Sequence, residues 1–166
     1  MSFKCKALFI IAPAVFAIDQ LTKYLINSRI EMGGSVAVMP DFFDIVHYAN
    51  SGAAFGMFSG VNSSWRAPFF YAVSALALIA IIFYIVKMSD SERIMAAALS
   101  FVVGGILGNG MDRIRFGAVT DFLSFHIADK KLFGYDLVWP AFNVADSAIT
   151  IAMFLIIIDS LRKKKQ

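Results

Sequence analysis

The sequence contains few charged residues for its length. Of the 166 residues, 16% are Asp, Glu, Lys or Arg, while 59% are hydrophobic and the mean hydropathy is +0.72. Soluble domains are about a quarter charged and about half apolar, and disordered segments are poorer still in apolar residues. The composition therefore excludes a soluble globular enzyme and a disordered tail.

Cysteine and histidine are also scarce. Cys5 is the only cysteine, which excludes an internal disulfide and therefore a disulfide-stapled secreted module. His47 and His126 are the only histidines, and they belong to different segments of the chain. A metal ion needs three or four ligands close together, so we expect no metal site.

Long apolar runs take the place of the missing charges. A helix that spans a membrane needs about 20 apolar residues. Segment 67–86 has that length and carries no charge, and segment 94–111 is slightly shorter and also carries no charge. Two further runs are apolar but carry Asp19 and Lys23, or Asp146 and Asp159. The four predicted spans are 7–26, 67–86, 94–111 and 142–161.

The first run has an alternative interpretation as a signal peptide. Lys4 and Lys6 precede it, and it contains the small-residue pattern Ala-Val-Phe-Ala at 14–17. We prefer a retained span, because an even number of spans agrees better with the distribution of charge.

Basic residues near the span ends predict the orientation. Eight of the 15 Lys and Arg residues lie in the two tails and the short 87–93 loop: Lys4, Lys6, Lys87, Arg93, Arg162, Lys163, Lys164 and Lys165. Both termini are therefore predicted to be cytoplasmic. We expect the basic tail to meet anionic lipid headgroups rather than nucleic acid, although the pI is 9.1.

The two outer segments, 27–66 and 112–141, are long enough to hold structure. Stretches 41–48 and 120–126 mix aromatic, β-branched and polar residues, which indicates short strands. Segment 59–66 contains Trp65 and resembles an interfacial helix turn. The predicted fold is an all-α membrane protein of one domain, 1–166, with four transmembrane helices, a small outer β-sheet cradle and a short interfacial helix on the outer face.

Polar residues converge on the outer end of this arrangement. They are Asp19, Lys23, Asn50, Asn109, Asp112, Arg113, Asp121, Asn143 and Asp146. Ionisable side chains inside a bilayer are costly and indicate a functional site. Gly104 and Gly108 have the spacing that allows close helix approach, so their face of the third span is expected to point inward.

Asp121 and Asp146 form the predicted reactive pair. One precedes the return of the chain into the membrane and the other follows it directly. Two neighbouring carboxyls at a partly dry surface do not both ionise, so one can act as a base and the other as an acid, as in aspartic proteases.

Structural interpretations compete for the remaining charges. We interpret Asp112 with Arg113 as an ion pair that holds helix ends. Asp19 and Lys23, four residues apart, are expected to pair with each other or with the outer loops, and Asp159 is interpreted as a solvated charge at the cytoplasmic end. Ser124 with His126, two residues on, is a weaker candidate for a serine mechanism.

Five stretches together resemble the bacterial lipoprotein signal peptidases (signal peptidase II). In chain order they are Asp-Gln-Leu-Thr-Lys at 19–23, Asn-Ser-Gly-Ala-Ala-Phe-Gly at 50–56, Gly-Asn-Gly-Met-Asp-Arg at 108–113, Gly-Ala-Val-Thr-Asp-Phe-Leu-Ser-Phe at 117–125 and Trp-Pro-Ala-Phe-Asn-Val-Ala-Asp-Ser at 139–147. The one departure is Gly110, where the family pattern has a larger apolar residue.

The resemblance implies an aspartic endopeptidase of the bacterial inner membrane that needs no cofactor. Its substrates would be prolipoproteins, cut just before a cysteine that already carries diacylglycerol, and globomycin would inhibit it. Asp121 and Asp146 would be catalytic. Supporting residues would be Asn50, Gly52, Asn109, Asp112, Arg113, Asn143, Asp19 and Lys23.

Two other classes of membrane protein fit the sequence less well. A small transporter or scaffold would need polar residues at several depths, whereas the middle of the second span is unbroken Ala, Leu and Ile. A lipid phosphotransferase would need a clustered metal-binding acid motif, which we do not find. Nothing demands more than a monomer, and which Asp is the base stays open because a coupled pair titrates jointly.

Overall fold

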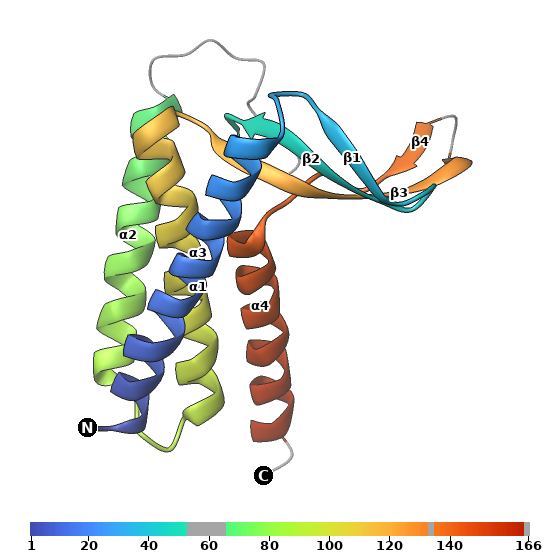
Figure 1. The fold of residues 1–166 in the computed structure, drawn as a ribbon. Coiled ribbons are helices and arrows are strands. Elements are labelled where there is room, and N and C mark those ends of the chain that lie inside the picture. The colour runs from blue at the N-terminus through green and yellow to red at the C-terminus, as the bar shows by residue number, and fades with distance from the viewer. Residues whose placement is uncertain (53–65, 133–134, 165–166) are drawn as a thin grey trace.

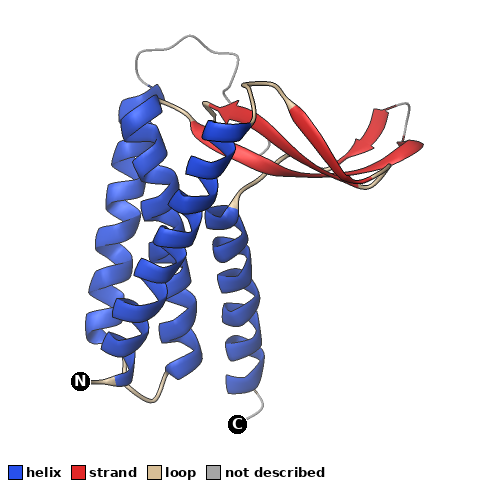
Figure 2. Ribbon diagram, in the orientation of Figure 1, coloured by secondary structure: helices blue, strands red, loops and turns tan. Residues whose placement is uncertain are grey.

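The computed structural model describes residues 1–52, 66–132 and 135–164. Four helices and four strands follow one another along the chain (Figures 1 and 2). In order they are α1 (Phe3–Arg29), β1 (Ser35–Met39), β2 (Phe43–Asn50), α2 (Arg66–Lys87), α3 (Arg93–Phe116), β3 (Val119–Leu132), β4 (Tyr135–Val138) and α4 (Val144–Lys163). The fold is thus mainly helical with a small sheet, as predicted.

All four helices are long and apolar enough to cross a membrane. They contain the predicted spans almost completely, and most extend a few residues beyond them. Two differences lie at the sheet end. Helix α3 continues beyond Met111 to Phe116, where Gly117 ends it in a left-handed conformation with φ of 72°. Helix α4 begins only at Val144, because Phe142 forms a β-bridge to Leu123 instead of a helical turn.

Helix α3 lies between α1 and α4, and its glycines allow both neighbours to approach closely. A Cβ added at Gly104 would lie 2.7 Å from Val15 Cβ of α1, and one at Gly105 would lie 2.7 Å from the Ala145 carbonyl oxygen of α4. At Gly108 it would lie 2.6 Å from Asp19 Oδ2. The predicted inward face of α3 is therefore confirmed, since even an alanine would force these helices apart.

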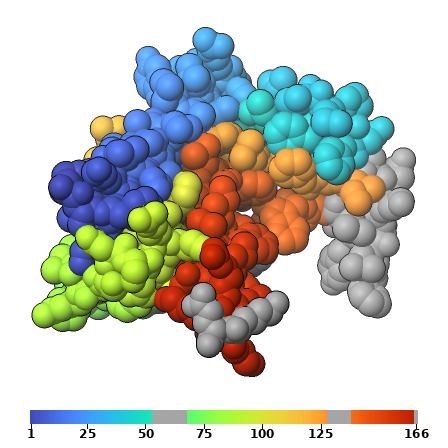
Figure 3. All heavy atoms as spheres, turned by 90° about the horizontal axis from the view of Figure 1, so that it is seen from below, coloured from blue at the N-terminus to red at the C-terminus, as the bar shows by residue number. Residues whose placement is uncertain are grey.

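The sheet has the strand order β1-β2-β3-β4, and every neighbouring pair is antiparallel. The long strand β3 pairs with β2 along its first half and with β4 along its second. The sheet lies at one end of the helix bundle and extends to one side of it (Figures 1 and 3). The two predicted strands are confirmed, whereas the predicted helix turn at 59–66 lies, apart from Arg66, outside the described residues.

Aromatic packing joins the start of α4 to the sheet. The ring centroids of Phe43 and Phe125 are 4.6 Å apart, and those of Phe125 and Phe142 are 5.9 Å apart. Because Phe142 also bridges to Leu123, the first turn of α4 is held against β3.

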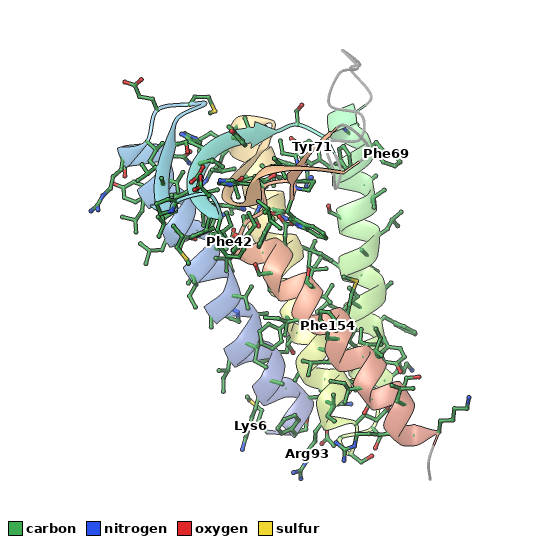
Figure 4. The ribbon with its side chains drawn as sticks, turned by 90° about the vertical axis from the view of Figure 1, so that its right-hand side faces the viewer. Lys6, Phe42, Phe69, Tyr71, Arg93 and Phe154 are labelled. Carbon is green, nitrogen blue, oxygen red and sulfur yellow. The ribbon has the colours of Figure 1, made fainter. Side chains whose placement is uncertain are left out.

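The opposite end of the bundle carries both termini and the α2–α3 connection (Figures 1 and 3). Lys6 and Arg93 lie at this end, far from Tyr71 and Phe42 at the sheet end (Figure 4). The interpretation of Asp159 as a solvated charge is wrong. It is 7% exposed and lies 3.0 Å from Lys163, which also contacts Glu92 at 2.8 Å, because α4 packs here against the α2–α3 connection.

Candidate active site

The predicted polar residues meet at the sheet end of the bundle. All of them lie within the described part of the chain, and a continuous set of hydrogen bonds and ion pairs connects them. The set comprises Asp19, Lys23, Asn50, Gly52, Asn109, Asp112, Arg113, Asp121, Asn143 and Asp146.

The first turn of α4 positions Asp146. Asn143 is the N-cap residue: its side-chain oxygen accepts from the Asp146 amide at 3.0 Å, and Asp146 Oδ2 accepts from the Asn143 amide at 3.2 Å. This reciprocal capping box satisfies two amides that a helix start otherwise leaves unpaired. A third, the Ala145 amide, donates to Asp19 Oδ1 of α1 at 2.9 Å.

Asp121 projects from β3 and is only 4% exposed. Asn50 Nδ2 of β2 donates to its Oδ2 at 3.0 Å, and Asn143 Nδ2 donates to its Oδ1 at 2.7 Å. Burial raises the pKa of this carboxyl from 3.8 to about 6, the hydrogen bond from Asn50 opposes the rise, and the charge of Asp146 adds to it. Asn143 thus binds both acids of the predicted pair.

Asp146 is linked to α1 through α3. Asn109 Nδ2 donates to Asp146 Oδ1 at 2.8 Å, while Lys23 Nζ donates to Asn109 Oδ1 at 2.9 Å. Because Lys23 binds the amide oxygen, the amide NH2 of Asn109 must face Asp146. Both oxygens of Asp146 therefore accept a hydrogen bond, and the orientation of its carboxyl group is fixed.

Lys23 is the only cation in the buried part of this network within the described ranges. It is 2% exposed and lies 2.9 Å from Asp19 Oδ2 and 3.3 Å from Asp112 Oδ2. The predicted pairing of Asp19 with Lys23 is confirmed. Such a buried group is stable only when its charges are paired and hydrogen-bonded.

The predicted ion pair between Asp112 and Arg113 is wrong. Asp112 contacts Lys23 and accepts from the Thr120 amide at 2.9 Å, so it ties the end of α3 to the start of β3. Neighbouring positions on a helix point about 100° apart, and Arg113 turns instead toward Gly52 and Phe70.

Arg113 connects α3 to the segment after β2. Its Nη2 donates to the Gly52 carbonyl at 3.2 Å, and its guanidinium lies 4.8 Å from the centre of the Phe70 ring. The Gly52 amide donates to Asn50 Oδ1 at 3.0 Å, and Asn50 in turn binds Asp121. Arg113 thus supports the pair through two intermediates.

Two residues of the network were not among those singled out from the sequence. Gln20 Nε2 lies 3.2 Å from Asp19 Oδ2, from the Gly108 carbonyl oxygen and from Asp112 Oδ1. Thr120 contributes its backbone, donating to Asp112 and accepting from Asn143 Nδ2 at 3.3 Å. The place of Gln20 in the 19–23 motif could have indicated its role. The role of Thr120 could not be predicted from its residue type, because only its backbone atoms take part.

The histidines stand apart from the acid pair. His47 Nδ1 lies 2.7 Å from the Ile30 carbonyl oxygen, and His126 Nδ1 lies 4.0 Å from Asp44 Oδ2. Within the described ranges no hydrogen bond joins Ser124 to His126, and no three His, Cys, Asp or Glu side chains are grouped to hold a metal ion. The chemistry that this geometry offers is therefore that of two carboxyls whose orientation asparagines fix.

A profile of the Signal peptidase (SPase) II family matches residues 11–162. The chain belongs to this family. The profile covers the first span through the last, including every residue of the network, and the family is one of peptidases. The resemblance inferred from the five motifs is confirmed.

Curated relatives and solved structures agree with this assignment. The chain is 39% identical over 160 residues to the lipoprotein signal peptidase of Syntrophus aciditrophicus (strain SB), covering 96% of this chain and 95% of the relative. It is 39% identical over 153 residues to the lipoprotein signal peptidase of Staphylococcus aureus (strain Newman), covering 92% of this chain and 86% of the relative.

Two solved bacterial membrane enzymes have the same fold. One, determined by the in meso method at 2.3 Å resolution, superposes with a TM-score of 0.78 at 38% identity, covering 94% of this chain and 88% of that one. The other, determined at 1.9 Å resolution, superposes with a TM-score of 0.76 at 38% identity, covering 92% of this chain and 91% of that one. With four apolar helices, the family member described here is thus a multi-pass membrane protein.

Proposed function

We propose that the protein is an intramembrane aspartic endopeptidase that removes the signal peptide from diacylglyceryl-modified prolipoproteins, cutting just before the lipidated cysteine. The observation that carries this proposal is the pair of carboxyls, Asp121 from the sheet and Asp146 from the bundle, which Asn143 binds together. Family membership and the names of the relatives support the substrate class.

In the proposed mechanism the pair carries one proton. The ionised carboxylate takes a proton from a water molecule, and the oxygen of that water attacks the scissile carbonyl carbon. The protonated carboxyl group donates to the carbonyl oxygen as the tetrahedral intermediate forms. As the intermediate collapses and the C–N bond breaks, the leaving amine takes the proton of the pair, and one hydroxyl group of the intermediate returns a proton to the pair as the new carboxyl group forms. The pair is thus left with one proton again. No metal ion and no other cofactor takes part.

The surrounding architecture suits a substrate that is half in the membrane. The signal helix would lie against the apolar bundle, while the extended residues at the cleavage site pair with the strand-forming outer segments. We place both termini in the cytoplasm and the pair at the outer face of the bacterial inner membrane. The chain works as a monomer, with its partners limited to prolipoproteins and membrane lipids.

Purified protein in detergent should cleave a diacylglyceryl-modified prolipoprotein and leave the same prolipoprotein without lipid intact. Mass spectrometry of the product should place the cut directly before the lipidated cysteine. Globomycin should block the reaction, and a chelator should leave it unchanged. Loss of activity with a chelator, or equal cleavage of the unlipidated substrate, would contradict the proposal.

The raised pKa of Asp121 also predicts how stability changes with pH. Between pH 3.8 and about 6 the folded protein holds a proton on Asp121 that the unfolded chain has released. Stability from this group therefore falls as the pH rises through that range. The thermal midpoint of the wild type should decline between pH 4 and pH 7 more steeply than that of Asp121→Asn. Parallel slopes would show that Asp121 titrates normally.

A further inference from the structure

An apolar cavity lies between α2 and α3 and reaches α1. It measures about 520 Å³, within the range of roughly 300–1,000 Å³ of small-molecule sites. Its walls include Phe16 of α1, Ala75 and Leu78 of α2, and Leu107 and Gly110 of α3. The cavity extends from Tyr71 and Arg113, near the sheet ends of α2 and α3, into the helix bundle.

Gly110 differs from the three other glycines of α3. Those at 104, 105 and 108 have neighbours within 3 Å of where a Cβ would be, so helix packing requires them. A Cβ at Gly110 would meet nothing within 4 Å. Glycine costs a helix interior about 1 kcal/mol relative to alanine, and at this position neither packing nor backbone conformation accounts for it. The missing side chain does enlarge the cavity.

Arg113 connects the cavity to the carboxyl pair. It lines the cavity and also binds the Gly52 carbonyl, which is next to the Asn50–Asp121 hydrogen bond through the Gly52 amide. Its Nε atom is buried and has no hydrogen-bond partner among the described residues. An apolar chain in the cavity would therefore have its polar end beside a free buried donor and close to the reacting groups.

We propose that this α2–α3 cavity holds one acyl chain of the lipidated substrate, and that Gly110 makes room for it. The inference rests on the proposed function, and it adds the site that binds the chain and the residue that gives the chain room. A hydrocarbon chain suits walls with so little polarity, and the Arg113 Nε–H would donate to the ester carbonyl at its end.

Matched substitutions on the two helices provide the test. Gly110→Leu and Ala75→Leu each narrow the cavity from one wall. Ala80→Leu makes the same change on the exposed face of α2, away from the cavity, and serves as the control. Each protein is given one prolipoprotein carrying either dipalmitoylglyceryl or diacetylglyceryl. Each substrate is also measured as a competitive inhibitor, so that slow cleavage still yields an affinity.

Both cavity variants should raise KM for the dipalmitoyl substrate about tenfold, or ~1.4 kcal/mol, as about two methylene groups lose their burial. Their kcat should be unchanged, their affinity for the diacetyl substrate should stay within about twofold, and Ala80→Leu should match the wild type. An equal loss of affinity for both substrates would overturn the inference. The two substrates differ only in acyl-chain length, so the cavity would then bind their common peptide part. Unchanged KM in two folded variants would overturn it as well.

The two proposals fail in different ways. If the wild type cleaves neither substrate, the proposed function is wrong and the acyl-chain inference falls with it. If the wild type cleaves lipidated substrate but the cavity variants show no chain-length effect, only the inference is wrong. Thermal midpoints of all variants identify any misfolded protein, and Ala75→Leu decides the matter if Gly110→Leu does not fold.

Discussion

Asp121→Asn and Asp146→Asn should each lower kcat by roughly a thousandfold or more on a diacylglyceryl-modified prolipoprotein. An amide can neither take a proton from water nor give one to the leaving group, so each change removes one half of the acid–base pair. Single-turnover cleavage in detergent is the measurement, because it detects residual chemistry apart from product release.

The acid variants require folded protein and a matched control. Both oxygens of Asp146 accept hydrogen bonds, from the Asn109 NH2 and from the Asn143 amide, so the NH2 of an asparagine at this position would face one of these two donors. We therefore expect Asp146→Asn to lose about 1–3 kcal/mol of stability while keeping its fold. Asp44→Asn changes another carboxyl of the same sheet, outside the network, and should retain full activity. Substantial turnover by both dyad variants would refute the aspartic mechanism.

Lys23→Met should destabilise the protein by about 3–5 kcal/mol, because it leaves Asp19 and Asp112 buried without a cation. Thermal unfolding in detergent checks this. The exposed residue on the same helix, Lys6, provides the control: Lys6→Met should stay within about 0.5 kcal/mol of the wild type.

A second variant distinguishes charge from packing at this position. Asp19→Asn combined with Lys23→Met removes one carboxylate together with the cation, and the asparagine oxygen can still accept from the Ala145 amide. The double variant should be more stable than Lys23→Met alone. If it is less stable, the lost packing of the lysine stem accounts for the effect and the electrostatic explanation is wrong.

The arrangement along the chain was predictable because it depends on simple patterns. Uncharged runs of sufficient length indicated the helices, and mixed aromatic and β-branched stretches indicated the strands. Topology alone then placed the polar residues at one end of the bundle. The small-residue spacing at Gly104 and Gly108 correctly predicted the face of α3 that packs inward.

Side-chain partners were less predictable, since they depend on helix rotation and on contacts distant in sequence. Asp112 bonds to Lys23 and to the Thr120 amide rather than to its neighbour Arg113. Asp159 is covered by the approach of Lys163 to Glu92, a contact between segments far apart in the chain. The capping box at Asn143 was also missed, because Asn-x-x-Asp is not the usual capping-box sequence.

The glycine contacts of α3 divide the bundle into two parts that are packed to different extents. Helices α1, α3 and α4 approach one another at backbone distance and hold Lys23, Asn109 and Asp146 in one rigid frame. Helix α2 is outside this frame: 6% of its spanning window is buried, against 44% for α3. If the protein takes a lipidated peptide from the bilayer as proposed, α2 is the helix whose displacement would disturb the alignment of Asp146 least.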